Sequence, residues 1–353
     1  MTVLTPAAFS LAQGAKWAFT TRRVRRADAA LLLRDVSGAR AGDLALGRIE
    51  RIGSHRNIQL ASGRPSELYP GDLVVLACGA RYAADQFEGL ATLDREGADM
   101  LAGGGVLGQM RQCHGKMAPP TRVAPLGLLA GADGAPLNLA AYALSPAPRP
   151  QGLPVIGVVG ASMNSGKTAA TASLAHGLAR AGRRVAAIKA TGTGAFGDVN
   201  AYADAGAHVA LDFTDAGMVS TYREPLGRIL ACLDTLLAEA VRQGCDCAVV
   251  EIADGVLQAE TAALLADPGA RSAFSGWLYA APDALAALGG AAALARVGIA
   301  PLALTGLITR APLLVAEAAA ATGLRVLERE ALRDPAEAAA LIATCETRAL
   351  GAA

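Results

Sequence analysis

The pattern of apolar and polar positions changes near the middle of the chain. Before residue 145 the apolar runs are short and are separated by turn residues such as Ser37-Gly38, Ser62-Gly63 and Pro70-Gly71-Asp72. Runs of this kind are typical of β-strands. We predict strands over Ala30–Val36, Asp43–Ile52, Asn57–Ala61 and Asp72–Cys78, and a hairpin loop at Gly131–Ala135 between Leu126–Ala130 and Pro136–Leu139. This part is expected to be a small barrel or sandwich.

Beyond residue 154 strand-like runs alternate with helix-like stretches. The β-branched run Pro154–Val159 precedes the helical composition of Lys167–Ala181, which ends at Gly182, a good helix terminator. Further predicted strands are Arg184–Ala190, His208–Phe213, Cys247–Ile252, Gly276–Ala281, Pro301–Ile308 and Leu324–Leu327, and further predicted helices include Leu226–Gln243 and Leu257–Ala266. Near-continuous apolar strands alternating with helices predict a parallel sheet covered on both faces.

A proline-rich segment separates the two patterns. Ser145–Pro154 reads SPAPRPQGLP and has no periodicity, as expected for a linker. We therefore predict a β-rich domain over residues 1–145, a linker over 146–154 and an α/β domain over 155–353. The fold class is α/β, with a parallel-sheet C-terminal domain preceded by the smaller β-rich domain.

Composition excludes several classes of function. Lys and Arg number 32 and Asp and Glu 31, so no large basic face for nucleic acid is indicated. No apolar run approaches the roughly 18–20 residues of a membrane helix, and the N-terminus lacks the features of a signal peptide. The six cysteines form no CxxC pair. We expect a cytoplasmic protein without membrane or nucleic-acid partners.

Lysine is rare, which draws attention to the positions that keep it. Lys16, Lys116, Lys167 and Lys189 are the only four among 32 basic residues. Where Arg is otherwise preferred, a retained Lys indicates that a compact ammonium is needed. Lys167 and Lys189 fall within one predicted strand–helix–strand unit. Lys116 follows Cys113-His114 in a Gly-rich stretch, for which a plain loop is the favoured interpretation and a binding site the alternative.

The sequence after the first strand of the α/β half matches GxxxxGK[ST] at every fixed position. The matching residues are Gly160, Ala161, Ser162, Met163, Asn164, Ser165, Gly166, Lys167 and Thr168. In such a loop the backbone amides and the following helix N-terminus cradle a phosphate group. Lys167 is placed to reach the β- and γ-phosphates, and the Thr168 hydroxyl to ligate Mg²⁺. A bound Mg²⁺-nucleotide, ATP with GTP as an alternative, is therefore predicted.

Polar residues at other strand ends are expected to complete this site. Glu251 ends a buried run, where a parallel sheet presents residues to a ligand, and is predicted to hold Mg²⁺. Lys189 ends a strand that we place parallel and adjacent to the phosphate-loop strand, and is predicted to bind the γ-phosphate or the acceptor. Asp212 is the candidate for a second Mg²⁺ ligand, with Asp215 as an alternative. Weaker candidates are the substrate contacts Thr191, Thr193, Asp198 and Asp254, and the base contacts Thr305, Thr309 and Arg310.

Three motifs together resemble the dethiobiotin-synthetase-like branch of P-loop proteins. They are GASMNSGKT, KATGTG after the second strand, and the strand-end VEIADG. The resemblance implies that Thr168, Glu251 and an intervening Asp hold Mg²⁺, and that Lys167 and Lys189 serve the phosphates and the acceptor. Ala161 stands where partition-type ATPases place an extra Lys, which argues against that branch. The chain also resembles two-domain P-loop proteins with a β-rich N-terminal part, some of whose relatives are acyltransferases that act on amino acids.

These features lead to a functional expectation with two alternatives. We expect a Mg²⁺-ATP-dependent enzyme, of ligase or kinase type, that transfers the γ-phosphoryl group to a carboxylate-type small molecule, with Lys167, Lys189 and Glu251 as catalytic residues. One alternative is a regulatory or assembly NTPase. The other is a coenzyme-A-dependent acyltransferase whose loop cradles a diphosphate. Related folds often bind the acceptor at a dimer interface, so a homodimer is expected.

Overall fold

The computed structural model describes residues 11–351, and the chain divides into two compact units. The first contains the described residues up to Leu144, together with Thr193–Phe196 and Phe213–Arg223 from the second half of the sequence. The second begins at Ser145 and contains the remainder. The prediction that the N-terminus lacks signal-peptide features falls in part on residues 1–10, which lie outside the described part of the chain.

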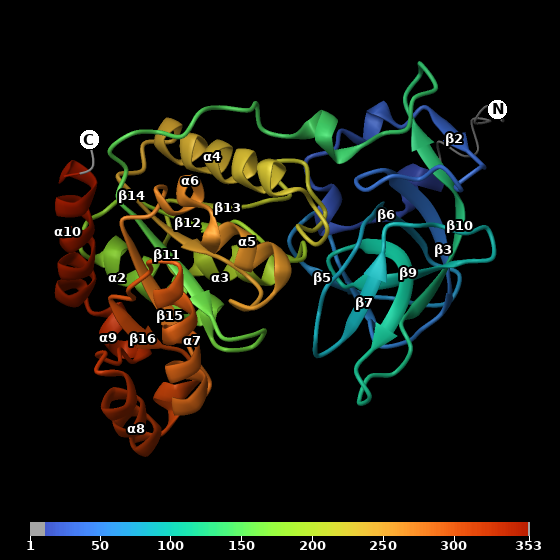
Figure 1. The fold of residues 1–353 in the computed structure, drawn as a ribbon. Coiled ribbons are helices and arrows are strands. Elements are labelled where there is room, and N and C mark those ends of the chain that lie inside the picture. The colour runs from blue at the N-terminus through green and yellow to red at the C-terminus, as the bar shows by residue number, and fades with distance from the viewer. Residues whose placement is uncertain (1–10, 352–353) are drawn as a thin grey trace. The chain divides into compact units, whose positions relative to one another are not determined.

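The first unit is built around a closed β-barrel (Figure 1). Its ring follows the pairings β6–β3–β10–β8–β9 and closes through parallel pairing of β9 with β6. Three further strands pair with the ring: β1 with β6, β2 with β10, and β7 with β9. The bounds are β1 Lys16–Trp17, β2 Leu31–Leu33, β3 Leu44–Arg51, β6 Leu73–Cys78, β7 Phe87–Leu90, β8 Ala98–Ala102, β9 Val106–Cys113 and β10 Thr121–Ala130, with β4 Asn57–Gln59 and β5 Pro65–Glu67 as a separate pair.

Strand alternation explains why the barrel buries both of its faces. In β6, Val74, Leu76 and Cys78 belong to one buried cluster, whereas Val75 and Ala77 belong to another. Successive side chains of a strand point to opposite faces, so β6 is apolar on both sides. Of the two alternatives predicted for this part of the chain, a barrel and a sandwich, the structure shows the barrel.

The second unit is a parallel α/β sheet, as predicted. Its strand order is β13-β12-β14-β11-β15-β16, and all five pairings are parallel. The bounds are β11 Val155–Gly160, β12 Val185–Lys189, β13 Val209–Asp212, β14 Cys247–Glu251, β15 Gly276–Ala280 and β16 Ala303–Thr305. The helices are α2 Lys167–Arg180, α3 Phe196–Asp204, α4 Leu226–Arg242, α5 Ala259–Ala266, α6 Pro268–Arg271, α7 Ala284–Arg296, α8 Pro312–Thr322, α9 Arg329–Arg333 and α10 Pro335–Gly351.

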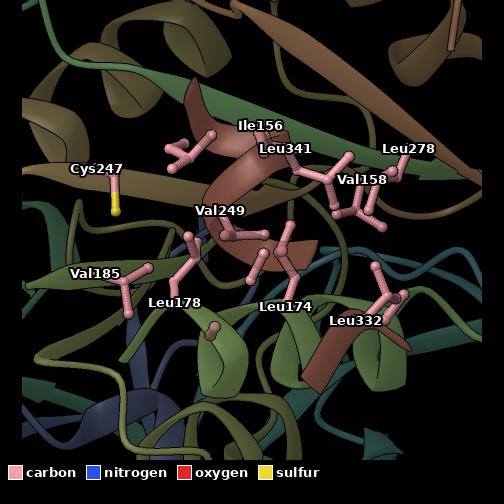
Figure 2. Close-up of a cluster of buried hydrophobic side chains, with 14 of the residues drawn as sticks. Ile156, Val158, Leu174, Leu178, Val185, Cys247, Val249, Leu278, Leu332 and Leu341 are labelled. Atoms are coloured by element: carbon pink, nitrogen blue, oxygen red, sulfur yellow. The ribbon is translucent and has the colours of Figure 1, made fainter. Parts of the chain in front are cut away.

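A buried apolar cluster fixes the phosphate-loop strand and the helix after it (Figure 2). Ile156 and Val158 of β11 and Val249 of β14 pack with Leu174 and Leu178 of α2, and helices α9 and α10 add further apolar side chains. Because both elements that flank the phosphate loop are anchored in one close-packed core, the loop between them has fixed ends.

The structure corrects two expectations about this sheet. Strand β12 is parallel to β11 but not adjacent to it, because β14 lies between them. Leu324–Leu327 is not a strand of the sheet, and only an isolated parallel bridge joins Val326 to Leu304. Residues 145–154, predicted as a linker, contain no helix or strand and belong to the second unit. Within the described residues, no helix is long and apolar enough to cross a membrane.

Candidate functional site

The phosphate loop connects β11 to α2 and depends on two glycines. A Cβ at Gly160 would lie 2.2 Å from the Ser165 Oγ. Gly166 has a φ of +104°, and a Cβ there would lie 2.8 Å from the Gly306 Cα. A side chain at either position would therefore displace the loop backbone. The helix begins at Lys167, so its N-terminal partial positive charge lies at the end of the loop.

Segments that follow two other strands hold the loop in place. After β14, the Val256 amide donates to the Gly160 carbonyl at 2.9 Å. After β16, the Leu307 amide donates to the Ser165 carbonyl at 3.0 Å. Gly255 approaches so closely that a Cβ would lie 2.5 Å from the Ala161 carbonyl oxygen. The loop is thus braced between the carboxyl ends of β14 and β16.

Lys167 is 5% exposed and points back along the loop. Its Nζ donates to the Ser162 carbonyl at 2.8 Å. Burial lowers the pKa of Lys167, and the nearby carboxylates of Glu251 and Asp254 oppose that shift in part. A buried ammonium with few fixed partners is well suited to bind a phosphate, which would satisfy its charge.

Two carboxylates converge on the hydroxyl of Thr168. Its Oγ1 lies 3.0 Å from the Asp198 Oδ1 and 3.2 Å from the Glu251 Oε1. Thr168 is the second residue of α2, Asp198 lies in the first turn of α3, and Glu251 ends β14. The structure thereby brings together a hydroxyl and two carboxylates, the oxygen ligands that Mg²⁺ accepts in proteins.

Lys189 at the end of β12 forms a partly buried ion pair with Asp198, whose Oδ2 accepts from Nζ. Burial alone would lower the pKa of Lys189, but the carboxylates of Asp198 and Glu251 outweigh it, and the pKa is raised. Lys189 is also the register partner of Asp212 on β13. The ammonium therefore stays charged and orients the Asp198 carboxylate.

Glu251 is 3% exposed and is held by Tyr202, a residue that was not predicted from the sequence. The Tyr202 hydroxyl on α3 donates to the Glu251 Oε2. Burial raises the pKa of Glu251 and the neighbouring Asp198 carboxylate raises it further, while Lys189 and Lys167 pull it down. Two acids this close repel each other, so a bound cation would stabilise the ionised pair.

A cavity of about 560 Å³ opens beside these residues. Most of the predicted contacts line it, among them Arg310, which follows β16. Its lining consists of Met163, Asn164, Gly166, Lys167, Thr168, Ala169, Lys189, Asp198, Glu251, Ala253, Asp254, Leu307 and Arg310. The volume lies within the range of small-molecule sites.

Three predicted residues take other positions. The Thr191 hydroxyl donates to the Ala253 carbonyl, which ties the turn after β12 to the turn after β14. Thr193 belongs to the first unit, where it pairs with Ser220. Asp212 is fully buried beside Lys189, whereas the carboxylates that contact Thr168 are those of Asp198 and Glu251. Asp198, predicted as a substrate contact, lies on α3 with its carboxylate at the Thr168 hydroxyl.

The oxygen atoms of Thr168, Asp198 and Glu251 suit Mg²⁺ better than a metal ion whose ligands all come from protein side chains. No group of three or more His, Cys, Asp or Glu side chains placed to hold a metal occurs in residues 11–351. Mg²⁺ characteristically uses one or two carboxylates and completes its shell with water and substrate phosphates. Thr168, Asp198 and Glu251 match that requirement.

Comparison with known proteins gives only distant structural similarity. No family model and no curated protein matches the chain. Similar solved structures include the signal recognition particle 54 kDa protein of Aeropyrum pernix in complex with GDP, at 19% identity and a TM-score of 0.37 over 58% of this chain and 49% of that one. Chloroplast FtsY of Physcomitrella patens has 18% identity and a TM-score of 0.38, over 57% of this chain and 67% of that one.

A third similar structure is FtsY of Elizabethkingia anophelis, at 18% identity and a TM-score of 0.32, over 53% of this chain and 60% of that one. The chain spans about half the length of the first of these proteins. At such TM-scores the similarity carries no functional argument. The chain's own features are a loop with the GxxxxGK[ST] pattern and a parallel α/β sheet, with the loop between a strand and a helix.

Proposed function

We propose that this protein is a Mg²⁺-ATP-dependent enzyme that transfers the γ-phosphoryl group to the carboxylate of a small molecule. The observation that carries the proposal is the convergence of Asp198 and Glu251 on the Thr168 hydroxyl at the start of α2. A loop that only cradles the diphosphate of a coenzyme has no need of two carboxylates at this hydroxyl. A Mg²⁺-triphosphate does need them.

The charges of the cavity support a metal–nucleotide complex. Three acidic side chains, Asp198, Glu251 and Asp254, and three basic ones, Lys167, Lys189 and Arg310, line it. The charges of these six side chains cancel, so a bound triphosphate would give the cavity a large net negative charge. Bound Mg²⁺ would neutralise part of the charge on the phosphates. Thr168, Asp198 and Glu251 would hold it, with Lys189 and Tyr202 fixing the two carboxylates.

A carboxylate acceptor also agrees with the side chains available. Histidine does not occur among the lining residues of this cavity, and the acidic groups at Thr168 are held by Lys189 and Tyr202. A carboxylate is already ionised at neutral pH and needs no general base. Its oxygen attacks the γ-phosphorus as the bond to the β–γ bridging oxygen breaks, giving an acyl phosphate and ADP. Lys167, Lys189 and Arg310 would bind the anionic groups.

The proposal is tested by trapping the product. The protein is incubated with Mg²⁺-ATP, hydroxylamine and a panel of mono- and dicarboxylic acids, and hydroxamate and ADP are measured. We expect hydroxamate to form with at least one acid, in an amount that matches the ADP released. Lys167→Ala should abolish both, and Lys116→Ala, at an exposed loop lysine, should change neither.

Two results would replace the proposal with an alternative. ADP release that is independent of every acid indicates a regulatory NTPase. A rise in melting temperature with acetyl-coenzyme A, and none with ATP or GTP plus Mg²⁺, indicates an acyltransferase.

A further inference from the structure

A second cavity, of about 320 Å³, lies wholly within the first unit. It shares no residue with the phosphate-loop site. Its lining combines two tyrosines, a carboxylate, two amides, a thiol and an imidazole: Tyr82, Ala83, Ala84, Gln86, Glu88, Gln112, Cys113, His114 and Tyr222. A concave site with a few converging polar groups is the usual form of a small-molecule pocket.

The antiparallel pair β7–β9 supplies the polar side of this cavity. Glu88 on β7 is the register partner of Gln112 on β9. Residues two apart on a strand share a face, and cross-strand partners lie side by side on it. Gln86 and His114 continue that arrangement, since the His114 amide donates to the Gln86 carbonyl at 2.8 Å. One carboxylate, two amides and an imidazole thus gather on one face.

The aromatic side comes from Tyr82 and from Tyr222 in the segment Phe213–Arg223. The two rings lie 5.7 Å apart between centroids and are tilted by 49°. The Tyr222 hydroxyl donates to the Glu88 Oε1 at 2.9 Å, so the carboxylate is held at the edge of the rings. The segment itself is fastened in this unit by an ion pair between Arg22 and Asp215 at 2.6 Å.

The lining favours a positively charged ligand. Glu88 is its only acidic side chain, and neither Lys nor Arg lines the cavity. Aromatic rings carry negative charge on their faces and attract cations. The chain itself provides an example at the same ring, because the Arg223 guanidinium lies 5.5 Å from the centroid of Tyr222.

We propose that this cavity binds a small organic cation, an alkylammonium or alkylguanidinium. The cationic group pairs with Glu88, and its alkyl stem lies against the rings of Tyr82 and Tyr222. The amide of Gln112 is placed to bind a polar group at the other end of the ligand, while the amide oxygen of Gln86 accepts from the Arg81 guanidinium at 2.9 Å. This site stands independently of the function proposed for the phosphate loop, because it uses none of the same residues.

The test is a ligand-observed NMR titration of the full chain with agmatine and n-butylammonium as cations, and with butyramide as the neutral analogue. We expect both cations to bind more tightly than butyramide. Glu88→Gln keeps an acceptor for Tyr222 but removes the charge, and it should weaken cation binding about tenfold. Tyr82→Leu should weaken cation binding about fivefold and leave the affinity for butyramide nearly unchanged.

The matched control is Glu67→Gln. Glu67 also accepts from a tyrosine hydroxyl, that of Tyr69, at 2.8 Å, but it does not line the cavity. This variant should bind the cations as the unchanged chain does, and every variant should keep its melting temperature. The proposal is overturned if neither cation binds, if butyramide binds as tightly as butylammonium, or if Glu88→Gln has no effect.

Discussion

The Thr168 hydroxyl at the start of α2 lies 3.0 Å from a carboxylate oxygen of Asp198, thirty residues further along the chain. Glu251, which lies 83 residues after Thr168, reaches the same hydroxyl at 3.2 Å. Three elements distant in sequence thus place oxygen ligands around one point, next to a loop built for phosphate. This relationship connects the fold to the proposed chemistry, and the predictions below depend on it and on its surroundings.

Removing the Lys189 ammonium should destabilise the protein. Lys189→Met leaves the partly buried carboxylate of Asp198 without its ion-pair partner, and we expect a loss of about 2 kcal/mol in the free energy of unfolding, measured in urea. Adding Asp198→Asn should restore part of the loss, since the uncompensated charge is then gone. Lys116→Met, at an exposed position, should cost nothing measurable. An equally small effect of Lys189→Met would show that the pair is unimportant for stability.

The hydroxyl of Tyr202 should set the acid side of the pH–activity profile. It donates to Glu251 and lowers the pKa of that carboxyl, which burial and Asp198 raise. Tyr202→Phe therefore raises the pKa of Glu251, and the acid limb should move to higher pH because the ionised form holds the metal. Tyr142→Phe removes a comparable hydrogen bond, to Asp28, and should leave the limb in place. A shift to lower pH would contradict this assignment.

A methyl group at Gly255 should disturb nucleotide binding without unfolding the protein. The added Cβ would lie 2.5 Å from the Ala161 carbonyl oxygen and 2.8 Å from the Ser162 Cα, so the loop must move. We expect the Kd for nucleotide to rise at least about tenfold in calorimetric titrations. Gly227→Ala in helix α4, where nothing lies within 4 Å of the added atom, is the control. Equal affinities for the two variants would mean that the loop tolerates displacement.

Acid should destabilise the first unit through His55. Its Nδ1 donates to the Met100 carbonyl at 3.0 Å, and burial, followed by the charge of Arg81, lowers its pKa from 6.5 to about 4. Because the folded-state pKa is the lower one, the contribution is complete above pH 6.5 and is lost as pH falls toward 4. The loss amounts to up to about 3 kcal/mol. His55→Gln should flatten the fall in melting temperature over this interval, and an unchanged slope would exclude His55 as its cause.

Much of the second unit follows from local sequence. The strand before Gly160, the helix after Gly166 and the apolar runs of β12 and β14 each contain the signal for their own structure. The phosphate loop was predictable for the same reason, because every residue that defines it is contiguous. Glu251 was predictable because it directly follows a buried run.

The partners of these residues were not predictable from the sequence. Asp198 and Tyr202 act from helix α3, whose approach to Thr168 and Glu251 depends on how the preceding turn folds. The adjacency of β12 and β14 is a property of the whole sheet. In the first unit, β8 carries the buried Asp99, which pairs with Arg122 at 3.1 Å, so this strand lacks the apolar run that would reveal it.

The most direct test of the metal site is the dependence of nucleotide affinity on Mg²⁺. Affinity for a non-hydrolysable ATP analogue is measured by calorimetry with Mg²⁺ and with EDTA, for the unchanged chain, Thr168→Ala and Asp198→Asn, with Asp204→Asn as an exposed control on the same helix. We predict that Mg²⁺ tightens binding at least about tenfold in the unchanged chain and the control, and by much less in the two site variants. Equal affinity with Mg²⁺ and with EDTA in the unchanged chain would contradict the account.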